Sequence, residues 1–507
     1  MKKVTACKFA KSSEPLQVDD VIYLPQGNSL HPRRERNRGV TIGRELWVQG
    51  IIGQQHGITV FFYLREAYTR YRMQHEGEPA WINRLYPREQ AEMRKHHILT
   101  EGIDPFALCP VVPFTGMGYA VVSDGLIDAT DRAFGLGRLH GIRQLGFLHN
   151  PVVHREKGRT ISQLFGHTRF CHSLDVMAIG TLIGLNLGLD EKRLRTLRVG
   201  CVTHDAMTPA GGDTTKLVDR EAFDEEKLYP RLFQDSRHNW LGLKRAYQLE
   251  EQPLIEMVHG QGLLGRILDI ADKTAYVARD ADHLLRRCEL LEYRREARGQ
   301  IQRLIRERPR ICALWDAIVV EDDQLVFTDS ERLADFLMLR ALMFRELYYN
   351  PSSRALETLV SKVLIQYLYD TGALTQEQLL VMMDWELDLK LDKLVGRSFW
   401  VTSDMGDPRV ETFQTTAEAS AHEAELGSKV ISFTEEFRRA TKAGTHFLVR
   451  HKKRTRTFRD AFPAQAKTIE KVLSCKDPVR LYYLPIEALR LPPELEQRLV
   501  ARKQIRK

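Results

Sequence analysis

The 507-residue sequence lacks the features of membrane-spanning, fibrous or disulfide-rich proteins. No uncharged apolar run reaches about 18 residues, so no membrane span is expected. Heptads, internal repeats and low-complexity segments are also missing. The basic opening MKKVTACKFAKSSEP makes a poor signal peptide, because Lys8 and Lys11 interrupt its apolar residues. The length and composition are those of a globular chain of two or three domains.

Cysteine is sparse and unpatterned. The seven cysteines form no CxxC pair, and their odd number cannot be fully paired within one chain. Several of them lie in apolar helical stretches. We therefore predict buried free thiols and a cytoplasmic protein.

The spacing of apolar residues predicts a mainly α fold in three parts. Residues 1–115 form a mixed N-terminal region, in which 45–73 has apolar spacing compatible with a helix. A helical core is expected over 116–388, with a polar interruption at 209–240 that suits a functional loop. Residues 389–507 carry four short strand-like runs and indicate a small, basic α+β domain; these runs are SFWVTS, KVISFT, HFLVRH and VRLYYLP.

The formal net charge of +8 favours anionic ligands without identifying them. Much of the excess lies in two runs, RHKKRTRTFR at 450–459 and RLVARKQIRK at 498–507. Such runs are usually solvated surfaces. Contact with nucleic acid in the basic C-terminal region is the second interpretation.

Four residues of metal-ligand type occur within apolar, helix-like segments: His172, the adjacent pair His204 and Asp205, and Asp272. Burying such groups is costly unless they are paired or bind a metal. Mixed imidazole and carboxylate donors suit Mg, Mn, Fe, Co or Zn, and the sequence does not choose among these divalent metals. Neighbours on a helix point about 100° apart, so the His-Asp pair should lie at a helix end, which the following MTPAGG supplies.

A polar stripe runs along the helix that carries Asp272. Asp269, Asp272, Tyr276 and Asp280 share one helical face, with Lys273 at its edge. Asp269 is the rival of Asp272 as a metal ligand. The competing interpretation is a solvated face with intrahelical ion pairs.

At these residues the chain resembles the HD-domain phosphohydrolases, and within them the deoxynucleoside triphosphate triphosphohydrolases, including the type with a sterile-alpha-motif domain. The resemblance covers about 120–385 and rests on RLHGIRQLG, TRFCHSLDV, the His-Asp pair, ADKTAYVARD and LRALMFRELYYNP. It implies an HD-domain helical core whose metal ligands are His172, His204, Asp205 and Asp272. It also implies phosphate contacts from Arg169, Lys273, Tyr276 and Arg340, and sugar contacts from Gln144, Leu145, Asp280 and Tyr348.

The sequence departs from that family where residues assist catalysis. Two expected histidines are replaced by Thr208 and Asp213, and a third corresponds to Asp224 in a loose alignment. Asp213, Asp219 or Asp224 could act as proton donors or bases. They could instead hold an additional Mg ion, or the chemistry could be weakened to a binding or regulatory role.

Three functions follow as hypotheses. The first is hydrolysis of a deoxynucleoside triphosphate to deoxynucleoside and triphosphate, with the nucleotide as substrate. The second is another nucleotide phosphohydrolase on the same scaffold: a monophosphatase, a phosphodiesterase or an alarmone hydrolase. The third is a nucleotide-sensing, nucleic-acid-binding regulator. The resemblance further implies a homo-oligomer.

Overall fold

The computed structural model describes residues 125–149, 167–287, 295–308, 311–312, 314–349, 354, 357–358, 360–396, 409–427, 430–436, 443–473, 478–489 and 493–497, together with strands at 47–52, 58–63, 111–114 and 118–121. These residues are mainly α-helical, with small sheets and an α+β C-terminal part. The predicted fold class is therefore confirmed. No helix among them is long and apolar enough to cross a membrane.

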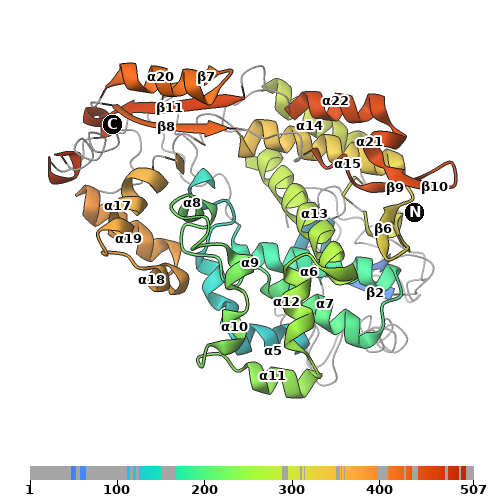
Figure 1. Ribbon diagram of the computed structural model, residues 1–507. Helices are drawn as coiled ribbons and strands as arrows, with labels where there is room; N and C mark the ends of the chain where they lie inside the picture. The colour runs from blue at the N-terminus through green and yellow to red at the C-terminus, as the bar shows by residue number, and fades with distance from the viewer. Residues whose placement is uncertain are drawn as a thin grey trace, which may run out of the picture.

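Three packed helices form the centre of the molecule (Figure 1). Helix α6 (Arg169–Asn186) packs against α7 (Glu191–Thr203) and α13 (Gly262–Arg287). Asp190 starts α7 by accepting a hydrogen bond from the Arg193 amide at 2.8 Å, as an N-cap residue does. Helices α6 and α7 approach closely at Gly180, where an added Cβ would lie 2.7 Å from the Cys201 sulfur.

Further helices surround this centre. On the N-terminal side and in the loop region they are α5 (Gly125–Phe134), α8 (Asp213–Lys216), α9 (Glu225–Leu228), α10 (Arg231–Gln234), α11 (Trp240–Tyr247) and α12 (Glu251–Val258). Beyond α13 they are α14 (Arg295–Glu307), α15 (Ser330–Met343), the π-helix η7 (Phe344–Tyr348), the π-helix η8 (Val360–Ile365), α17 (Gln366–Asp370), α18 (Gln376–Val381) and α19 (Asp384–Val395). The C-terminal part adds α20 (Thr416–Leu426), α21 (Phe458–Ala461) and α22 (Pro463–Leu473).

The N-terminal sheet corrects one prediction. Within 45–73, where a helix was expected, β1 (Trp47–Ile52) and β2 (Ile58–Tyr63) pair as an antiparallel hairpin. β-Branched and aromatic residues dominate these strands, and Gly53 and Gly57 separate them, so strand preference outweighs the helical spacing. Strands β4 (Gly118–Val121) and β3 (Val111–Phe114) complete the sheet, in the order β1-β2-β4-β3.

Two further sheets involve the C-terminal part. Three of its four predicted strands are confirmed as β8 (Val430–Glu436), β9 (Leu448–His451) and β11 (Val479–Pro485), whereas SFWVTS lies outside the described residues. Strand β11 is central between β7 (Arg409–Phe413) and β8. The other sheet has the order β10-β9-β6-β5, with β5 (Ile318–Glu321), β6 (Gln324–Phe327) and β10 (Arg454–Thr457). Its parallel β6–β9 pair joins residues on both sides of the expected 388/389 boundary.

One buried carboxylate joins three segments that are distant in the sequence. Asp384, the first residue of α19, accepts hydrogen bonds from the Gly211 amide at 2.7 Å and the Arg143 amide at 2.9 Å. Gly146 lies in the same place with φ +51°, where a Cβ would meet the Gly211 carbonyl oxygen at 2.4 Å. The turn after Gln144 and Leu145 is thereby held against the turn after the His-Asp pair.

The predicted thiols are free where the structure describes them. Cys201 and Cys312 are buried and Cys171 is half-buried. Burial raises the pKa of the Cys312 thiol to about 12, which keeps it protonated and unreactive.

Replacing Asp384 with alanine should lower the free energy of unfolding by about 3 kcal/mol, because two amides and the nearby Arg143 guanidinium would lose a buried partner. Denaturant unfolding measures this change. The matched control is Glu307→Ala on the exposed end of α14, which should change stability by less than about 0.5 kcal/mol. Equal stability of both variants would contradict the role assigned to Asp384.

Candidate metal centre

The four predicted metal ligands come from three elements that pack together. His172 lies in the first turn of α6, and Asp272 lies in the middle of α13. His204 is the C-cap of α7, with Asp205 directly after it. The His-Asp pair thus lies at a helix end, as its adjacency required.

The donor atoms converge. His172, His204 and Asp272 each offer one donor atom, and these atoms lie within 4.8 Å of one another. The His172 Nε2 lies 2.9 Å from the Asp272 Oδ1, and the His204 Nε2 lies 3.8 Å from that same oxygen. Ligands at right angles on bonds of about 2.1 Å would lie about 3 Å apart. These three residues could therefore hold a metal ion.

Asp205 borders this group. Its Oδ2 lies 3.7 Å from the His172 Nε2 and 3.6 Å from the His204 Nε2. The same oxygen accepts a hydrogen bond from Arg169 at 2.9 Å. Burial raises the pKa of Asp205, but Arg169 and then the two imidazoles outweigh burial and hold that pKa far below its usual range. Asp205 is therefore an ionised carboxylate at the edge of the triad.

The tautomer of His204 suits metal binding. Its Nδ1 lies 2.7 Å from the Cys201 carbonyl oxygen, to which a protonated Nδ1 donates. In the neutral ring, the form that would bind a metal, this leaves the lone pair of Nε2 facing Asp272 and Asp205. A ligand histidine held by a backbone carbonyl in this way is typical of metal sites.

A chain of alternating charges leads away from Asp205. Arg169 also donates to the Asp213 Oδ2 at 2.9 Å, and the other Asp213 oxygen lies 3.0 Å from the Lys216 ammonium. Lys216 in turn pairs with Glu225. The Asp213 side chain is about half exposed; partial loss of solvent raises its pKa, but Lys216 and Arg169 outweigh this effect and bring the pKa well below its usual value. Asp213 is therefore ionised at neutral pH and cannot serve as a proton donor.

The other two residues at the altered positions lie differently. Thr208 is buried, and its hydroxyl donates a long hydrogen bond of 3.4 Å to the Asp205 Oδ1. Asp224 is the N-cap of α9, where its carboxylate accepts from the Glu226 and Lys227 amides at 3.2 and 3.4 Å. Asp219 accepts from two amides of a turn in the same manner. The structure places Asp213 and Thr208 beside Arg169 and Asp205, and gives Asp224 and Asp219 local capping contacts.

The polar stripe on α13 divides into an outer and an inner part. At its outer end the exposed Asp269 forms an intrahelical ion pair with Lys273. For these two residues the interpretation as a solvated face with ion pairs is therefore correct. Further in, the Tyr276 hydroxyl accepts from the Arg340 Nε at 2.9 Å. Burial raises the pKa of Tyr276 to about 12, so its own proton stays available for donation.

The inner end of the stripe is a buried polar cluster. Asp280 is fully buried, and it accepts from the Tyr348 hydroxyl and lies 3.0 Å from the His167 Nε2. The backbone N–H of Gln144 donates to the His167 carbonyl oxygen at 3.3 Å. The Gln144 side-chain oxygen is buried, with no hydrogen-bond partner among the described residues. This unsatisfied oxygen fits a ligand that brings a donor such as a hydroxyl. Leu145, beside it, is buried in the core.

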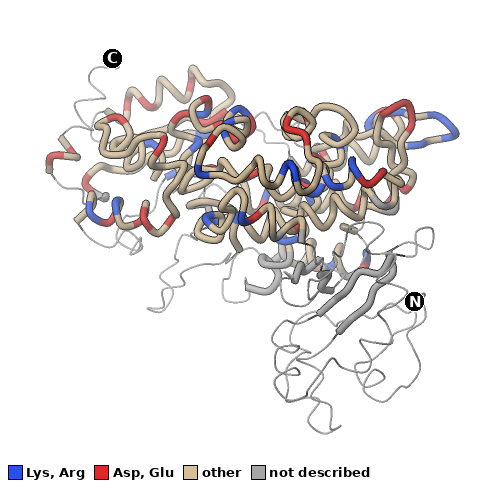
Figure 2. The backbone as a smooth tube through the Cα atoms, turned by 90° about the horizontal axis from the view of Figure 1, so that it is seen from below, with Lys and Arg blue, Asp and Glu red and all other residues tan. Residues whose placement is uncertain are grey.

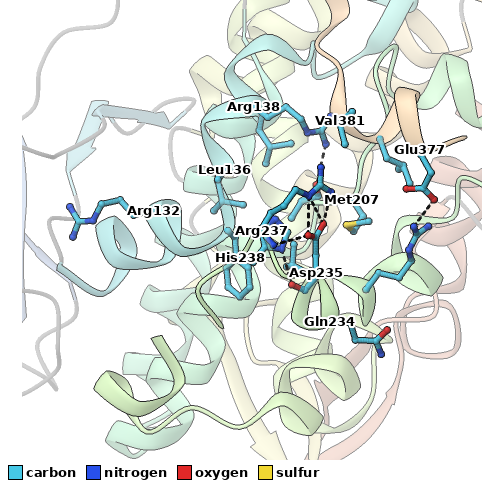
Figure 3. A pocket seen from close by; sticks show the side chains of 17 residues that line it. Arg132, Leu136, Arg138, Met207, Gln234, Asp235, Arg237, His238, Glu377 and Val381 are labelled. Carbon is cyan, nitrogen blue, oxygen red and sulfur yellow. Dashed lines mark hydrogen bonds and ion pairs between the residues drawn. The ribbon is translucent and has the colours of Figure 1, made fainter. Parts of the chain in front are cut away.

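A separate cavity of about 480 Å³ lies behind the His-Asp turn, between α5, α10 and α18 (Figure 3). Ala206 and Met207 line it, as do several arginines. Two of the arginines that line the cavity form ion pairs with acids that also line it: Arg237 with Asp235, and Arg231 with Glu377. Arg138 donates to the carbonyl oxygens of Met382, Ala206 and Thr208. This cavity supports the turn and adds no donor to the metal group.

Three residues of the site were not predicted from the sequence: His167, Lys216 and Glu225. Lys216 lies three residues after Asp213 in the polar segment 209–240, so its i,i+3 spacing was a usable signal. Glu225 and His167 follow no spacing that would single them out. Only the folded chain brings them beside Lys216 and Asp280.

No family model matches the chain, and no curated protein does. The roles of the site residues are therefore inferred from their contacts, distances and burial.

Asp272 and Asp269 offer a matched test on one helix. Asp272→Ala removes a donor of the triad and should weaken binding of Mn²⁺ or Co²⁺ more than about 100-fold, beyond the usual effect of a supporting residue. Asp269→Ala removes only the ion pair with Lys273 and should bind metal within about threefold of the unaltered protein. Titration calorimetry of metal-stripped protein measures both, and the reverse order would make Asp269 the ligand.

Proposed function

We propose that the protein is a metal-dependent phosphohydrolase that converts a deoxynucleoside triphosphate and water to the deoxynucleoside and triphosphate. The observation that carries the proposal is the convergence of the His172, His204 and Asp272 donor atoms within 4.8 Å, with Asp205 at their edge. Nearby cations and a buried polar cluster support the choice of substrate.

A divalent ion held by these residues would polarise a phosphoryl oxygen and lower the pKa of a bound water. The donor set suits Mg, Mn, Fe, Co or Zn. Arg169 keeps Asp205 ionised and fixes its orientation through the 2.9 Å hydrogen bond. In the reaction the water oxygen bonds to the α-phosphorus, the bond from phosphorus to the 5′ oxygen breaks, and the 5′ oxygen leaves with a proton. The proton that the water loses balances the proton that the leaving 5′ oxygen takes up, so the step needs no further reactant.

The phosphate side is assigned to Lys273, Tyr276 and Arg340. The Arg340 guanidinium is buried and its Nε donates to the Tyr276 hydroxyl, which fixes both side chains before a ligand arrives. Preorganised cations and donors of this kind stabilise phosphoryl charge without reorganisation. Lys273 lies one residue beyond Asp272, at the edge of the polar stripe on α13.

The sugar side is assigned to Gln144, Leu145, Asp280 and Tyr348. The buried Gln144 oxygen and the Asp280 carboxylate are acceptors suited to a ribose hydroxyl. The Tyr348 ring packs edge-on against Tyr276, with 5.8 Å between ring centroids, and so joins the sugar side to the phosphate side. The bulk of Leu145 and Tyr348 would exclude a 2′-hydroxyl by steric contact.

Another nucleotide phosphohydrolase activity (monophosphatase, phosphodiesterase or alarmone hydrolase) is the second candidate. One observation favours it: Thr208 and Asp213 stand at the altered positions, where they contact Asp205 and Arg169. Neither is a proton donor of the imidazole type. A reaction whose leaving group needs less assistance would suit such a site.

Incubation with each deoxynucleoside and ribonucleoside triphosphate under Mn, Mg, Co and Fe should release deoxynucleoside and intact triphosphate, identified by mass spectrometry. Asp205→Ala should abolish the product, because the site loses a buried anion beside the metal donors. Inorganic phosphate or a linearised nucleotide as product would favour the second candidate. Intact substrates under all metals would reject both.

Tyr348 provides a matched pair for the sugar. Tyr348→Ala should raise hydrolysis of ribonucleotides relative to deoxynucleotides by about tenfold or more, because space opens beside the sugar. Tyr348→Phe removes only the hydroxyl that donates to Asp280 and should keep the discrimination. The ratio of kcat/KM values measures the effect. Unchanged discrimination in Tyr348→Ala would remove Tyr348 from the sugar side.

A further inference from the structure

The β9–β10 hairpin carries a group of exposed cations that the metal centre does not use. It is visible as the loop at the right edge of Figure 2, where β9 and β10 lie in Figure 1. Lys452, Lys453, Arg454 and Arg456 are all exposed. Among the described residues none of these four, here named the hairpin cations, has an ion-pair partner.

The acids near the hairpin are engaged elsewhere. Glu321 of β5 binds Arg450 at 2.7 Å and also accepts from the Thr455 hydroxyl. Glu470 of α22 pairs with Arg459 at 2.6 Å. Both acids are thus neutralised by other arginines, while the tip and outer strand of the hairpin keep their charge. An ordinary solvent-exposed surface would carry both positive and negative side chains along the strand.

The backbone presents the hairpin cations together. Thr455 turns toward Glu321, so Arg454 and Arg456 lie on the other side of β10, about 7 Å apart along the strand. Lys452 and Lys453 form the turn with φ of +47° and +64°, a conformation that asparagine and glycine adopt more readily. Strained residues at such positions often accompany function. β10 is also the outer strand of its sheet.

We propose that the β9–β10 hairpin binds the phosphate backbone of a nucleic acid through the hairpin cations. Phosphate contacts need only cations in an exposed row, and such contacts position a strand without reading its bases. Stable attachment to a membrane usually combines a basic patch with an apolar anchor, and a protein interface usually has a buried aromatic anchor. No large hydrophobic side chain is exposed on this hairpin.

The proposal is independent of the activity at the metal centre, and its test is a binding measurement on the full chain. The hairpin variant combines Lys452→Asn, Lys453→Asn, Arg454→Gln and Arg456→Gln; asparagine tolerates positive φ, so the turn is retained. The matched control removes the same charge elsewhere, by substituting Gln for Lys192, Arg193, Lys227 and Lys244, all exposed. Circular dichroism and thermal unfolding check that both variants are folded.

Fluorescence anisotropy with labelled DNA and RNA oligonucleotides measures affinity against salt. Four phosphate contacts predict that between about 50 and 200 mM salt the unaltered protein loses about 50-fold more affinity for a single strand than the hairpin variant does. The control variant should keep the salt slope of the unaltered protein. An equal slope in the hairpin variant, or no binding by the unaltered protein, would overturn the proposal. Hairpin-dependent binding to anionic phosphatidylserine vesicles without oligonucleotide binding would overturn it in favour of a membrane.

Discussion

The charge on the buried Asp205 carboxylate is the constraint on which the centre of this protein depends. An ionised group almost removed from water must be compensated, and the Arg169 guanidinium and the imidazoles of His172 and His204 approach it. Arg169 and His172 lie in the first turn of α6, and His204 is the C-cap of α7. The packing of α6 on α7 and α13 therefore fixes the site, and close contact at Gly180 permits that packing.

The same constraint gives Arg169 a definite role. Both of its terminal nitrogens are engaged, one with Asp205 and the other with Asp213. In this arrangement Arg169 orients two carboxylates, whereas the family resemblance implies a phosphate contact for it. Beyond Asp213 the ion pairs continue with alternating charge, from Asp213 to Lys216 and from Lys216 to Glu225. Asp213 thus takes part in a charged network at a position where the family resemblance expects a histidine.

Much of the core could be predicted because its signals are local. Apolar spacing gave the long helices, and the adjacency of His204 and Asp205 required a helix end that α7 provides. The N-terminal hairpin was predicted wrongly, since 45–73 carries a helix-like spacing and strand-favouring residues at once. The β6–β9 pair and the His167–Asp280 contact join distant residues, and no local pattern encodes such pairings. The Asp224 capping role was hidden because an acid before a helix looks the same in sequence as a catalytic one.

Pulsed electron paramagnetic resonance of the Mn²⁺-loaded protein, with ¹⁵N-labelled histidine, tests the central claim most directly. The account predicts that one bound ion couples to two imidazole nitrogens, and that His172→Ala and His204→Ala each remove one coupling. A bound ion that shows no histidine nitrogen, or couplings that survive both substitutions, would contradict it.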